Sequence, residues 1–416
     1  MNKKVCIITL GCKVNKYESD SIAKSLESYG YETSEELGFA DYYIINTCAV
    51  TNEAEKKSRQ YISKINKIND NAHIIICGCG AEKHKDEYLK KKNVKAVFNF
   101  QRKDLIIKYL NQEEYSEKQL ECFNSNLVDP KIIQARAYIK IQDGCNRFCS
   151  YCIIPYVRGR SVSRDLDSII TEATQLSKVY KEIVVVGIDM SDYRINGKLA
   201  LQDVMKSLAG VKSRIRLGSL EVSVINQEFM EILSKMPNFA PQFHLSLQSG
   251  DDYVLSKMNR KYTSDEYLKA VELIYRYFPN ANITTDIIVG FPYESEEAFN
   301  NTLKLAKKVK FGKIHCFPFS AKKGTIAYTY KEIPIDIKRK RMEMLENVAN
   351  ELQINYCKQY IGKELNLLIE EIEDKYYVGY SENYIKCYIK KDCTQEIGEI
   401  VKVVGKRLYK EGLEVK

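Results

Sequence analysis

Three cysteines in one short segment have the clearest chemical meaning in this chain. Cys145, Cys149 and Cys152 follow the spacing C-x3-C-x2-C, directly after a strand-like run at 138–142. Structural zinc sites use four ligands, often two C-x2-C pairs, and no second pair is nearby in the sequence. Three thiolates can instead hold a 4Fe-4S cluster and leave one iron open to a substrate. The spacing therefore favours a catalytic iron–sulfur cluster, with a zinc loop as the alternative.

A second set of cysteines is scattered along the N-terminal third. Cys12, Cys48 and Cys79 each stand two residues beyond the end of a different strand-like run. The carboxyl ends of parallel strands meet at one edge of an open sheet, where ligands bind, so these cysteines can converge. A single cysteine at a strand end is more often a small buried apolar residue. Three equivalent positions favour a ligand set, which again leaves one iron open.

Alternating strand-like and helical runs in the N-terminal part of the chain predict the elements that position these three cysteines. The alternation over residues 1–112 predicts an open parallel α/β sheet covered by helices. Residues 113–135 are polar and aperiodic, and we interpret them as a linker. The predicted strands are 5–10, 42–46, 74–77 and 95–98, and the predicted helices are 17–29, 53–68, 82–91 and 103–110.

A second alternating series, over residues 136–361, predicts a partial (β/α)6 barrel followed by a long helix at 338–356. Barrel enzymes place their chemistry on loops after strand carboxyl ends. The C-x3-C-x2-C segment lies on the first such loop. The six predicted strands are 138–142, 183–186, 214–217, 243–247, 283–289 and 313–317.

The last part of the chain, residues 362–416, lacks a helical period and predicts a small all-β barrel. This region has ten Lys and Arg against eleven Asp and Glu. If it binds RNA, we expect a local basic face with tyrosines that stack on bases. The candidate basic residues are Lys386, Lys390, Lys391, Lys406 and Arg407.

The composition excludes several classes of protein. With 416 residues, 44% of them hydrophobic and 29% charged, the chain is an ordinary globular protein of several domains. No apolar run approaches the ~20 residues that span a bilayer, so we expect no membrane segment. Thirteen cysteines are too few for a secreted disulfide scaffold, so we expect reduced thiols and a cytoplasmic protein. The net charge of +9 is compatible with a polyanionic partner.

The cysteine segments resemble the motifs of a known family. With Tyr151 in the aromatic place, C-x3-C-x-aromatic-C is similar to the signature of radical S-adenosylmethionine enzymes. The segments around the other three cysteines resemble the three cysteine motifs of radical methylthiotransferases, and residues 362–416 resemble their TRAM-like RNA-binding barrel. The resemblance covers essentially the whole chain. The segments that carry it, besides the C-x3-C-x2-C segment, are 9–19, 46–48, 78–82, 154–160, 247–252, 258–263, 285–292 and 379–384.

The resemblance implies two 4Fe-4S clusters and S-adenosylmethionine. One cluster, on Cys145, Cys149 and Cys152, binds S-adenosylmethionine and yields a 5′-deoxyadenosyl radical. The other, on Cys12, Cys48 and Cys79, carries the sulfur that a second S-adenosylmethionine methylates. Candidate cofactor contacts are less specific, because three of them have an alternative role as turn residues. They are Tyr151, Gly187, Gln248 and Gly290.

The first motif separates branches of the family. Residues 11–15, Gly-Cys-Lys-Val-Asn, followed by Tyr17-Glu18-Ser19, are similar to the bacterial branch that modifies N6-threonylcarbamoyladenosine beside the tRNA anticodon. The implied partners are the anticodon stem-loop of tRNA, an electron donor such as flavodoxin or ferredoxin, and an unknown sulfur donor. The alternatives are isopentenyladenosine in tRNA, a ribosomal-protein side chain, and a metal-stabilised RNA-binding protein without turnover.

Several other polar residues have a structural and a functional interpretation. We interpret His244 and His315, in barrel strands, as satisfied core groups that can also touch the substrate. Three arginines after the cluster loop, Arg158, Arg160 and Arg164, are candidate phosphate contacts, although such charges are more often only solvated. The remaining cysteines are taken as structural, with Cys77 a possible competitor of Cys79. They are Cys6, Cys77, Cys122, Cys316, Cys357, Cys387 and Cys393.

Overall fold

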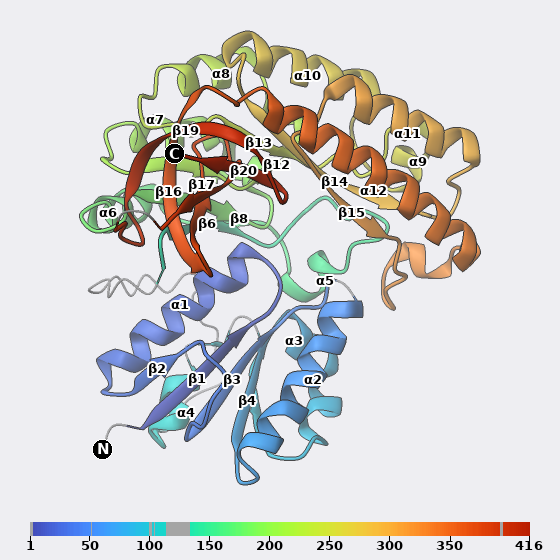
Figure 1. The fold of residues 1–416 in the computed structure, drawn as a ribbon. Helices are drawn as coiled ribbons and strands as arrows, with labels where there is room; N and C mark the ends of the chain where they lie inside the picture. The colour runs from blue at the N-terminus through green and yellow to red at the C-terminus, as the bar shows by residue number, and fades with distance from the viewer. Residues whose placement is uncertain (1–2, 51, 100–101, 104, 114–133, 392–393) are drawn as a thin grey trace. The chain divides into compact units, whose positions relative to one another are not determined.

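The chain divides into two compact units in the computed structural model (Figure 1). The first unit holds the N-terminal sheet together with residues 142–148 and 152–164. The second holds residues 130–141, 149–151 and 165–416. The predicted linker lies almost wholly outside the described residues, which are 3–50, 52–99, 102–103, 105–113, 134–391 and 394–416.

A parallel five-stranded sheet, in the order β2-β1-β3-β4-β5, forms the centre of the first unit. Aliphatic runs in its central strands allow burial on both faces. Helices α1 and α4 cover the face that contains Ile7 and Ile44, and α2 and α3 cover the face that contains Ile8 and Ile45. The predicted open α/β sheet is confirmed. The elements are β1 (Lys4–Thr9), α1 (Lys13–Ser28), β2 (Glu32–Ser34), β3 (Tyr42–Thr47), α2 (Asn52–Ile68), β4 (His73–Gly78), α3 (Cys79–Leu89), β5 (Val94–Val97) and α4 (Leu105–Leu110).

Six parallel strands with helices between them form the partial barrel, and all six are predicted from the sequence. They lie in two sheets, β11-β8-β6-β7 and β12-β13-β14-β15. A bridge between Ile215 and Phe239 connects β11 to the segment before β13. The six strands are β6 (Ala137–Asp143), β8 (Glu182–Gly187), β11 (Arg214–Leu217), β13 (Gln242–Leu245), β14 (Asn282–Val289) and β15 (Lys313–Pro318). Short additional strands are β7 (Val162–Ser163), β12 (Ser219–Leu220) and the separate pair β9 (Arg194–Ile195) and β10 (Lys198–Leu199).

The helices of this region begin where the sequence supplies a capping side chain. Thr263 and Glu266 form a capping box that starts α10, and Asp165, Asn226 and Ser295 each accept a backbone N–H at a helix start. The helices are α5 (Ile154–Arg158), α6 (Leu166–Leu176), α7 (Leu201–Leu208), α8 (Gln227–Ser234), α9 (Asp252–Lys257), α10 (Ser264–Tyr277), α11 (Glu296–Val309) and α12 (Ile335–Lys358). Among the described residues, none of the helices is long and apolar enough to cross a membrane.

The C-terminal region is a closed barrel in the order β16-β17-β18-β20-β19, as predicted from its β-rich runs. Closure leaves no exposed sheet edge. Tyr356 and Cys357, near the end of α12, pack into its core with Leu365 and Leu413. The strands are β16 (Glu364–Glu373), β17 (Tyr376–Tyr380), β18 (Lys386–Lys390), β19 (Ile400–Tyr409) and β20 (Gly412–Val415).

A fully buried carboxylate, Glu182 at the start of β8, joins the barrel wall to this C-terminal domain. Its oxygens accept from Arg216 Nη2 at 2.9 Å and pair with Arg136 Nη1 at 3.0 Å. A third partner, Arg214, lies beside it on β11. The arginines reach on to the C-terminal domain, since Arg216 donates to the carbonyl of Ser381 at 3.0 Å. The ion cluster therefore holds the two parts of this unit together.

The Glu182 cluster predicts an acid-sensitive stability. Burial alone raises the pKa of Glu182, but the charges of the three arginines outweigh it and hold the pKa below its usual 4.5. The folded state then binds fewer protons than the unfolded state, so this contribution is present above about pH 5 and is lost as the pH falls. Glu182→Gln should lower the free energy of unfolding at pH 7 by ~3–5 kcal/mol, because it leaves the arginines without their carboxylate.

Urea unfolding of both proteins at pH 7 and pH 4, followed by circular dichroism, checks this expectation. The difference between wild type and variant should shrink at pH 4. The half-exposed Glu399, which lies 3.8 Å from Lys181, provides the control substitution Glu399→Gln, with an effect below ~1 kcal/mol. A difference between wild type and Glu182→Gln that does not change with pH would contradict the assignment.

Candidate functional site

The structure brings together the loops of the three N-terminal cysteines. Cys12 stands before α1, Cys48 follows β3, and Cys79 is the first residue of α3. Gly11 has φ +100°, and a Cβ at this position would lie 2.7 Å from the Cβ of Cys48. Only glycine tolerates both the backbone conformation and this approach. The first cysteine loop therefore rests directly on the second.

Side chains of the same motifs fasten these loops to one another. Asn15 donates from Nδ2 to the carbonyl of Leu10 at 2.7 Å and to that of Thr47 at 3.0 Å. Asn46 returns a bond from its Nδ2 to the carbonyl of Asn15 at 2.9 Å. Gly78, with φ +94°, lets the third loop approach Asn46 closely. Buried backbone groups at the sheet edge are thus satisfied by side chains of the motifs themselves.

The three thiols interact electrostatically, as neighbours must. Burial raises the pKa of the Cys48 thiol to about 12, the thiols of Cys12 and Cys79 act in the same direction, and Arg158 acts against them. The sulfur atoms of Cys12, Cys48 and Cys79 do not all lie within 4.8 Å of one another. A single zinc ion, with Zn–S bonds of about 2.3 Å, needs closer sulfurs. A cluster whose thiolates bind different irons fits the wider spacing.

Arg158, at the end of α5, is the central polar residue of the first unit. Its guanidinium is buried, with 2% of the residue exposed. It donates from Nε to Cys79 Sγ at 3.1 Å, from Nη2 to Asn15 Oδ1 at 2.8 Å, and from Nη1 to Asp143 Oδ2 at 3.0 Å. Glu18 accepts two further bonds, at 2.9 and 3.0 Å. The interpretation of Arg158 as a phosphate contact is therefore wrong, because protein anions surround it.

The two flanking arginines differ in exposure. Arg164 is buried and donates to the hydroxyl of Tyr17 at 3.4 Å, so it is also not a surface phosphate contact. Arg160 is exposed, and its guanidinium lies 4.4 Å from the ring centroid of Phe148. Of the three candidates, only Arg160 has the exposure that a phosphate contact needs.

The C-x3-C-x2-C segment contributes to the same unit as the N-terminal cysteines. Cys79 packs in a small apolar cluster with Ala49, Ile153 and Val157. Ile153 directly follows Cys152, and Asp143, the partner of Arg158, stands two residues before Cys145. Residues on both sides of the segment thus contact the N-terminal sheet within one compact unit.

The middle of the segment belongs to the second unit and has its own contacts. Arg260 donates from Nη1 to Cys149 Sγ at 3.5 Å and from Nη2 to the carbonyl of Ser246 at 3.1 Å. The backbone N–H of Ser150 donates to the backbone carbonyl of Met258 at 3.0 Å, and the ring of Tyr151 packs edge-on against that of Phe291. The sequence reasoning assigns no role to Arg260, although it lies in the segment 258–263 that carries the resemblance.

The other predicted cofactor contacts have visible structural roles. Gly187 ends β8. Gln248, with φ +64°, follows β13 and lies beside β14. Its backbone N–H donates to the backbone carbonyl of Asp286 at 2.8 Å. Gly290, with φ +73°, leaves no room for a Cβ, which would lie 2.5 Å from Lys338 Cγ of α12. The turn interpretation accounts for Gln248 and Gly290 without a cofactor.

The remaining described cysteines are free thiols outside the two cysteine sets. Cys77 is fully buried in β4 and packs with Ile7 and Ile44, beneath α1 and α4. Burial raises its pKa to about 12. Cys6, Cys357 and Cys387 are buried too, Cys316 is partly exposed, and Cys122 and Cys393 lie outside the described residues.

The predicted basic face of the C-terminal domain is largely neutralised. Lys386 pairs with Glu373 and Glu411, each at 3.2 Å. Lys406 and Arg407 both pair with Glu414, whose pKa they lower to about 2. Lys390 and Lys391 are exposed at the end of β18. The sequence does not reveal the acidic partners of Lys386, Lys406 and Arg407.

Two family descriptions match the chain. Residues 4–99 match the "Uncharacterized protein family UPF0004", and residues 139–306 match the "Radical SAM superfamily". A protein of Thermotoga maritima named "Threonylcarbamoyladenosine tRNA methylthiotransferase MtaB" is 36% identical over 99% of this chain and 96% of its own length. A Bacillus subtilis protein of the same name is also 36% identical, over 96% and 93%. A Fervidobacterium nodosum protein named "tRNA-2-methylthio-N(6)-dimethylallyladenosine synthase" is 32% identical over 88% of each chain.

Solved structures support the fold. The radical S-adenosylmethionine methyltransferase TsrM from Kitasatospora setae covers 76% of this chain and 75% of its own, with a TM-score of 0.57 and 12% identity. The cobalamin-dependent enzyme OxsB covers 83% of this chain and 56% of its own, with a TM-score of 0.51 and 9% identity. At these identities the likeness concerns the fold alone.

The contacts of Arg158 predict a large effect of its removal. Arg158→Ala leaves Glu18 and Asp143 buried with fewer cationic partners, and the loss of one member of a buried ion pair typically costs ~3–5 kcal/mol. We expect a loss of this size in the free energy of unfolding, measured by urea titration with circular dichroism. Arg160→Ala, two residues along the chain but exposed, should change it by less than ~0.5 kcal/mol. Equal effects of the two substitutions would contradict the assignment.

Proposed function

Because the chain belongs to the radical S-adenosylmethionine methylthiotransferase family, we propose that it installs a 2-methylthio group on N6-threonylcarbamoyladenosine at position 37 of tRNA, next to the anticodon. Family membership makes the protein an enzyme, a transferase. The observation that carries the proposal is the convergence of the Cys12, Cys48 and Cys79 loops at one sheet edge, in the unit that also includes Cys145 and Cys152.

The radical S-adenosylmethionine fold implies S-adenosylmethionine and a 4Fe-4S cluster. Cys145, Cys149 and Cys152 would hold this cluster, since their three partly exposed thiols leave one iron free. We assign a second cluster to Cys12, Cys48 and Cys79. Together the groups would supply one-electron cleavage of S-adenosylmethionine and a carrier for the sulfur that is transferred.

The chain's own residues prepare the thiols for this role. A bound thiolate ligand carries negative charge, which a neighbouring cation offsets. Arg158 Nε lies 3.1 Å from Cys79 Sγ, and Arg260 Nη1 lies 3.5 Å from Cys149 Sγ, so each cysteine set has a cation beside one of its sulfurs. Both side chains are fixed by further hydrogen bonds, so they also orient the sulfurs. We infer that each is a positioning residue for its set.

The choice of substrate rests on the branch of the family. The relatives that carry the threonylcarbamoyladenosine name are 33–36% identical over 95–99% of the chain, and those that carry the dimethylallyladenosine name are 32–35% identical over 88–98%. Because these identities overlap, the assignment rests on the first motif, residues 11–15 and 17–19, whose form resembles the threonylcarbamoyladenosine branch. We therefore place isopentenyladenosine second and a ribosomal-protein side chain third. We also propose a cytoplasmic enzyme that receives electrons from flavodoxin or ferredoxin, with a sulfur donor still to be identified.

An anaerobic assay with defined substrates tests the proposal. Cluster-loaded enzyme, S-adenosylmethionine and a reductant should methylthiolate tRNA that bears threonylcarbamoyladenosine, as detected by mass spectrometry of its nucleosides. A tRNA that lacks the threonylcarbamoyl group and the unmodified ribosomal protein are the comparison substrates. A product only on isopentenyladenosine or on protein would overturn the substrate assignment. Zinc in place of roughly eight irons per chain, without cleavage of S-adenosylmethionine, would favour a non-catalytic RNA-binding protein.

Separate tasks for the two cysteine sets predict a selective defect. Cys48→Ala should leave reductive cleavage of S-adenosylmethionine intact, because Cys145, Cys149 and Cys152 are unchanged. The methylthio product should fall at least ~100-fold, because the second cluster loses a ligand. Both quantities are measured in one anaerobic reaction, as 5′-deoxyadenosine and as modified nucleoside.

Cys77→Ala is the matched control, because Cys77 is also buried at this sheet but packs among aliphatic side chains. It should keep both activities. Equal loss of cleavage and of product in a folded Cys48→Ala protein would contradict the division of tasks.

A further inference from the structure

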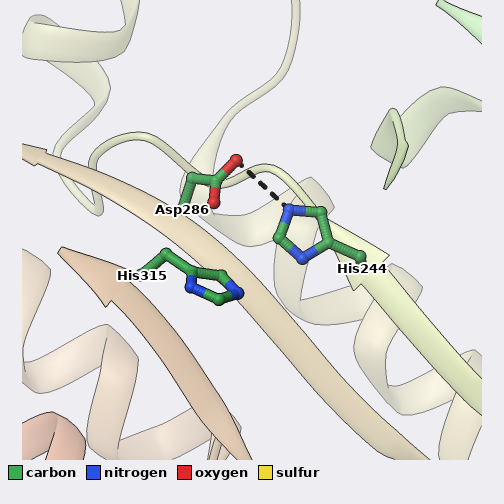
Figure 2. A group of neighbouring side chains, drawn as sticks. All are labelled: His244, Asp286 and His315. Carbon is green, nitrogen blue, oxygen red and sulfur yellow. Dashed lines mark hydrogen bonds and ion pairs between the residues drawn. The ribbon is translucent and has the colours of Figure 1, made fainter. Parts of the chain in front are cut away.

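Three polar side chains from neighbouring strands meet in the second unit, apart from the cysteines. His244 lies on β13, Asp286 on β14 and His315 on β15, and Figure 2 shows them gathered on one side of these strands. The interpretation of His315 as a core group is wrong, because the residue is exposed, whereas its neighbour Ile314 is buried. His244 is half-buried and hydrogen-bonded, as a satisfied group should be.

The parallel register explains why these residues meet. Asp286 pairs directly with His315, and His244 pairs with Thr284, two residues before Asp286. Side chains alternate between the two faces of a strand, and the adjacent residues Phe243 and Ile314 pack in the hydrophobic core. The three polar side chains therefore share the opposite face.

The donor atoms of the three residues lie close together. One ligand atom from each, the ring nitrogens of His244 and His315 and a carboxylate oxygen of Asp286, all fall within 4.8 Å of one another. His244 Nε2 is 3.2 Å from Asp286 Oδ2 (Figure 2), and the two imidazole rings lie 5.8 Å apart. This is the only group of its kind among the residues that the structure describes.

The other ring nitrogen of His244, Nδ1, has a hydrogen-bond partner on the neighbouring strand β14. Nδ1 lies 3.0 Å from Thr284 Oγ1, which also accepts a bond from Gln242 Nε2 at 3.0 Å. A histidine that binds a metal usually donates its other ring N–H to such a partner, which fixes the tautomer and the direction of the ring. In the tautomer whose Nδ1–H donates to Thr284, Nε2 carries the lone pair and faces Asp286 Oδ2, so one cation can bind both atoms.

We propose that His244, Asp286 and His315 bind one divalent transition-metal ion, separate from the iron–sulfur clusters. Two imidazoles and one carboxylate are the nitrogen and oxygen donors that suit zinc, ferrous iron, cobalt or manganese. Metal–ligand bonds of about 2.0–2.2 Å place donor atoms roughly 3–3.5 Å apart, and in the structure the donor atoms of the three residues lie within 4.8 Å of one another. One negative charge on Asp286 offsets part of the charge of the ion.

The site is accessible and incomplete, as a site with an exchangeable position must be. The side chains of His244 and Asp286 are 13% and 28% exposed, and His315 is exposed. Three protein ligands leave at least one coordination position for water or for an oxygen donor of a bound molecule. Asp286 stands three residues before the end of β14, so the ion would lie about 10 Å below the strand ends.

Metal analysis of the cluster-loaded enzyme tests this proposal without reference to activity. The protein is dialysed anaerobically against micromolar zinc, and zinc, iron and acid-labile sulfide are then quantified. Because a 4Fe-4S cluster holds equal numbers of iron and sulfide, metal in excess of sulfide counts the new site. We expect roughly one excess ion per chain in the wild type. Its affinity should fall at least ~100-fold in His315→Ala and ~10–100-fold in Thr284→Val, which removes the partner of Nδ1.

His84→Ala is the matched control. His84 lies 3.2 Å from Glu87 and 3.7 Å from Glu55 but has no second imidazole beside it. This variant should bind the ion as the wild type does. Three outcomes would each overturn the proposal. They are no metal in excess of sulfide in the wild type, the same excess of metal in His315→Ala as in the wild type, and a loss of metal in His84→Ala as large as that in His315→Ala. Circular dichroism establishes that His315→Ala is folded, as expected for a change at an exposed residue.

Discussion

A buried guanidinium must be surrounded by acceptors, and this constraint fixes the geometry around Arg158. The side chain has five N–H donors in a rigid plane, and they reach Cys79, Asn15, Glu18 and Asp143 together. These partners come from α1, from the start of α3 and from the end of β6. A shift of any one of these elements would remove a hydrogen bond from a fully buried guanidinium, which is costly. The position of Cys79 and the start of the C-x3-C-x2-C segment therefore depend on each other.

The second unit uses the same physical device for a different purpose. Glu182 is an anion among three arginines, whereas Arg158 is a cation among two carboxylates and a thiol. In each place the charges are withdrawn from water, so their attraction depends strongly on distance and orientation. Such clusters contribute little net stability compared with apolar packing, but they penalise every other arrangement. The ion cluster around Arg158 fixes the positions of the cysteine loops, and the ion cluster around Glu182 fixes the position of the C-terminal domain on the barrel wall.

Much of this fold was accessible from the sequence because its signals are local. Uninterrupted aliphatic runs mark buried parallel strands, and a cysteine after each run must fall at the same sheet edge. The short strands β2, β7, β12 and β20 escaped prediction because two to four residues carry no periodicity. The burial of Arg158 was inaccessible, because its partners Cys79 and Asn15 are 79 and 143 residues away and arginine is normally exposed. The meeting of His244, Asp286 and His315 likewise depends on strand register, which the sequence does not display.

Main-chain oxygens make much of the attachment of the C-terminal domain, although Arg136 also pairs with the carboxylate of Glu370 and the guanidinium of Arg216 lies 4.8 Å from the ring centroid of Tyr384. Arg216 donates to the carbonyls of Ser381 and Glu382, Arg214 to that of Asn366, and Asn282 to that of Asn383. Every amino acid offers the same carbonyl, so these hydrogen bonds do not depend directly on which side chains the contacted segments carry. The side chains of Ser381, Asn383 and Tyr384 act differently, because they fix the course of the loop or contact the arginines themselves.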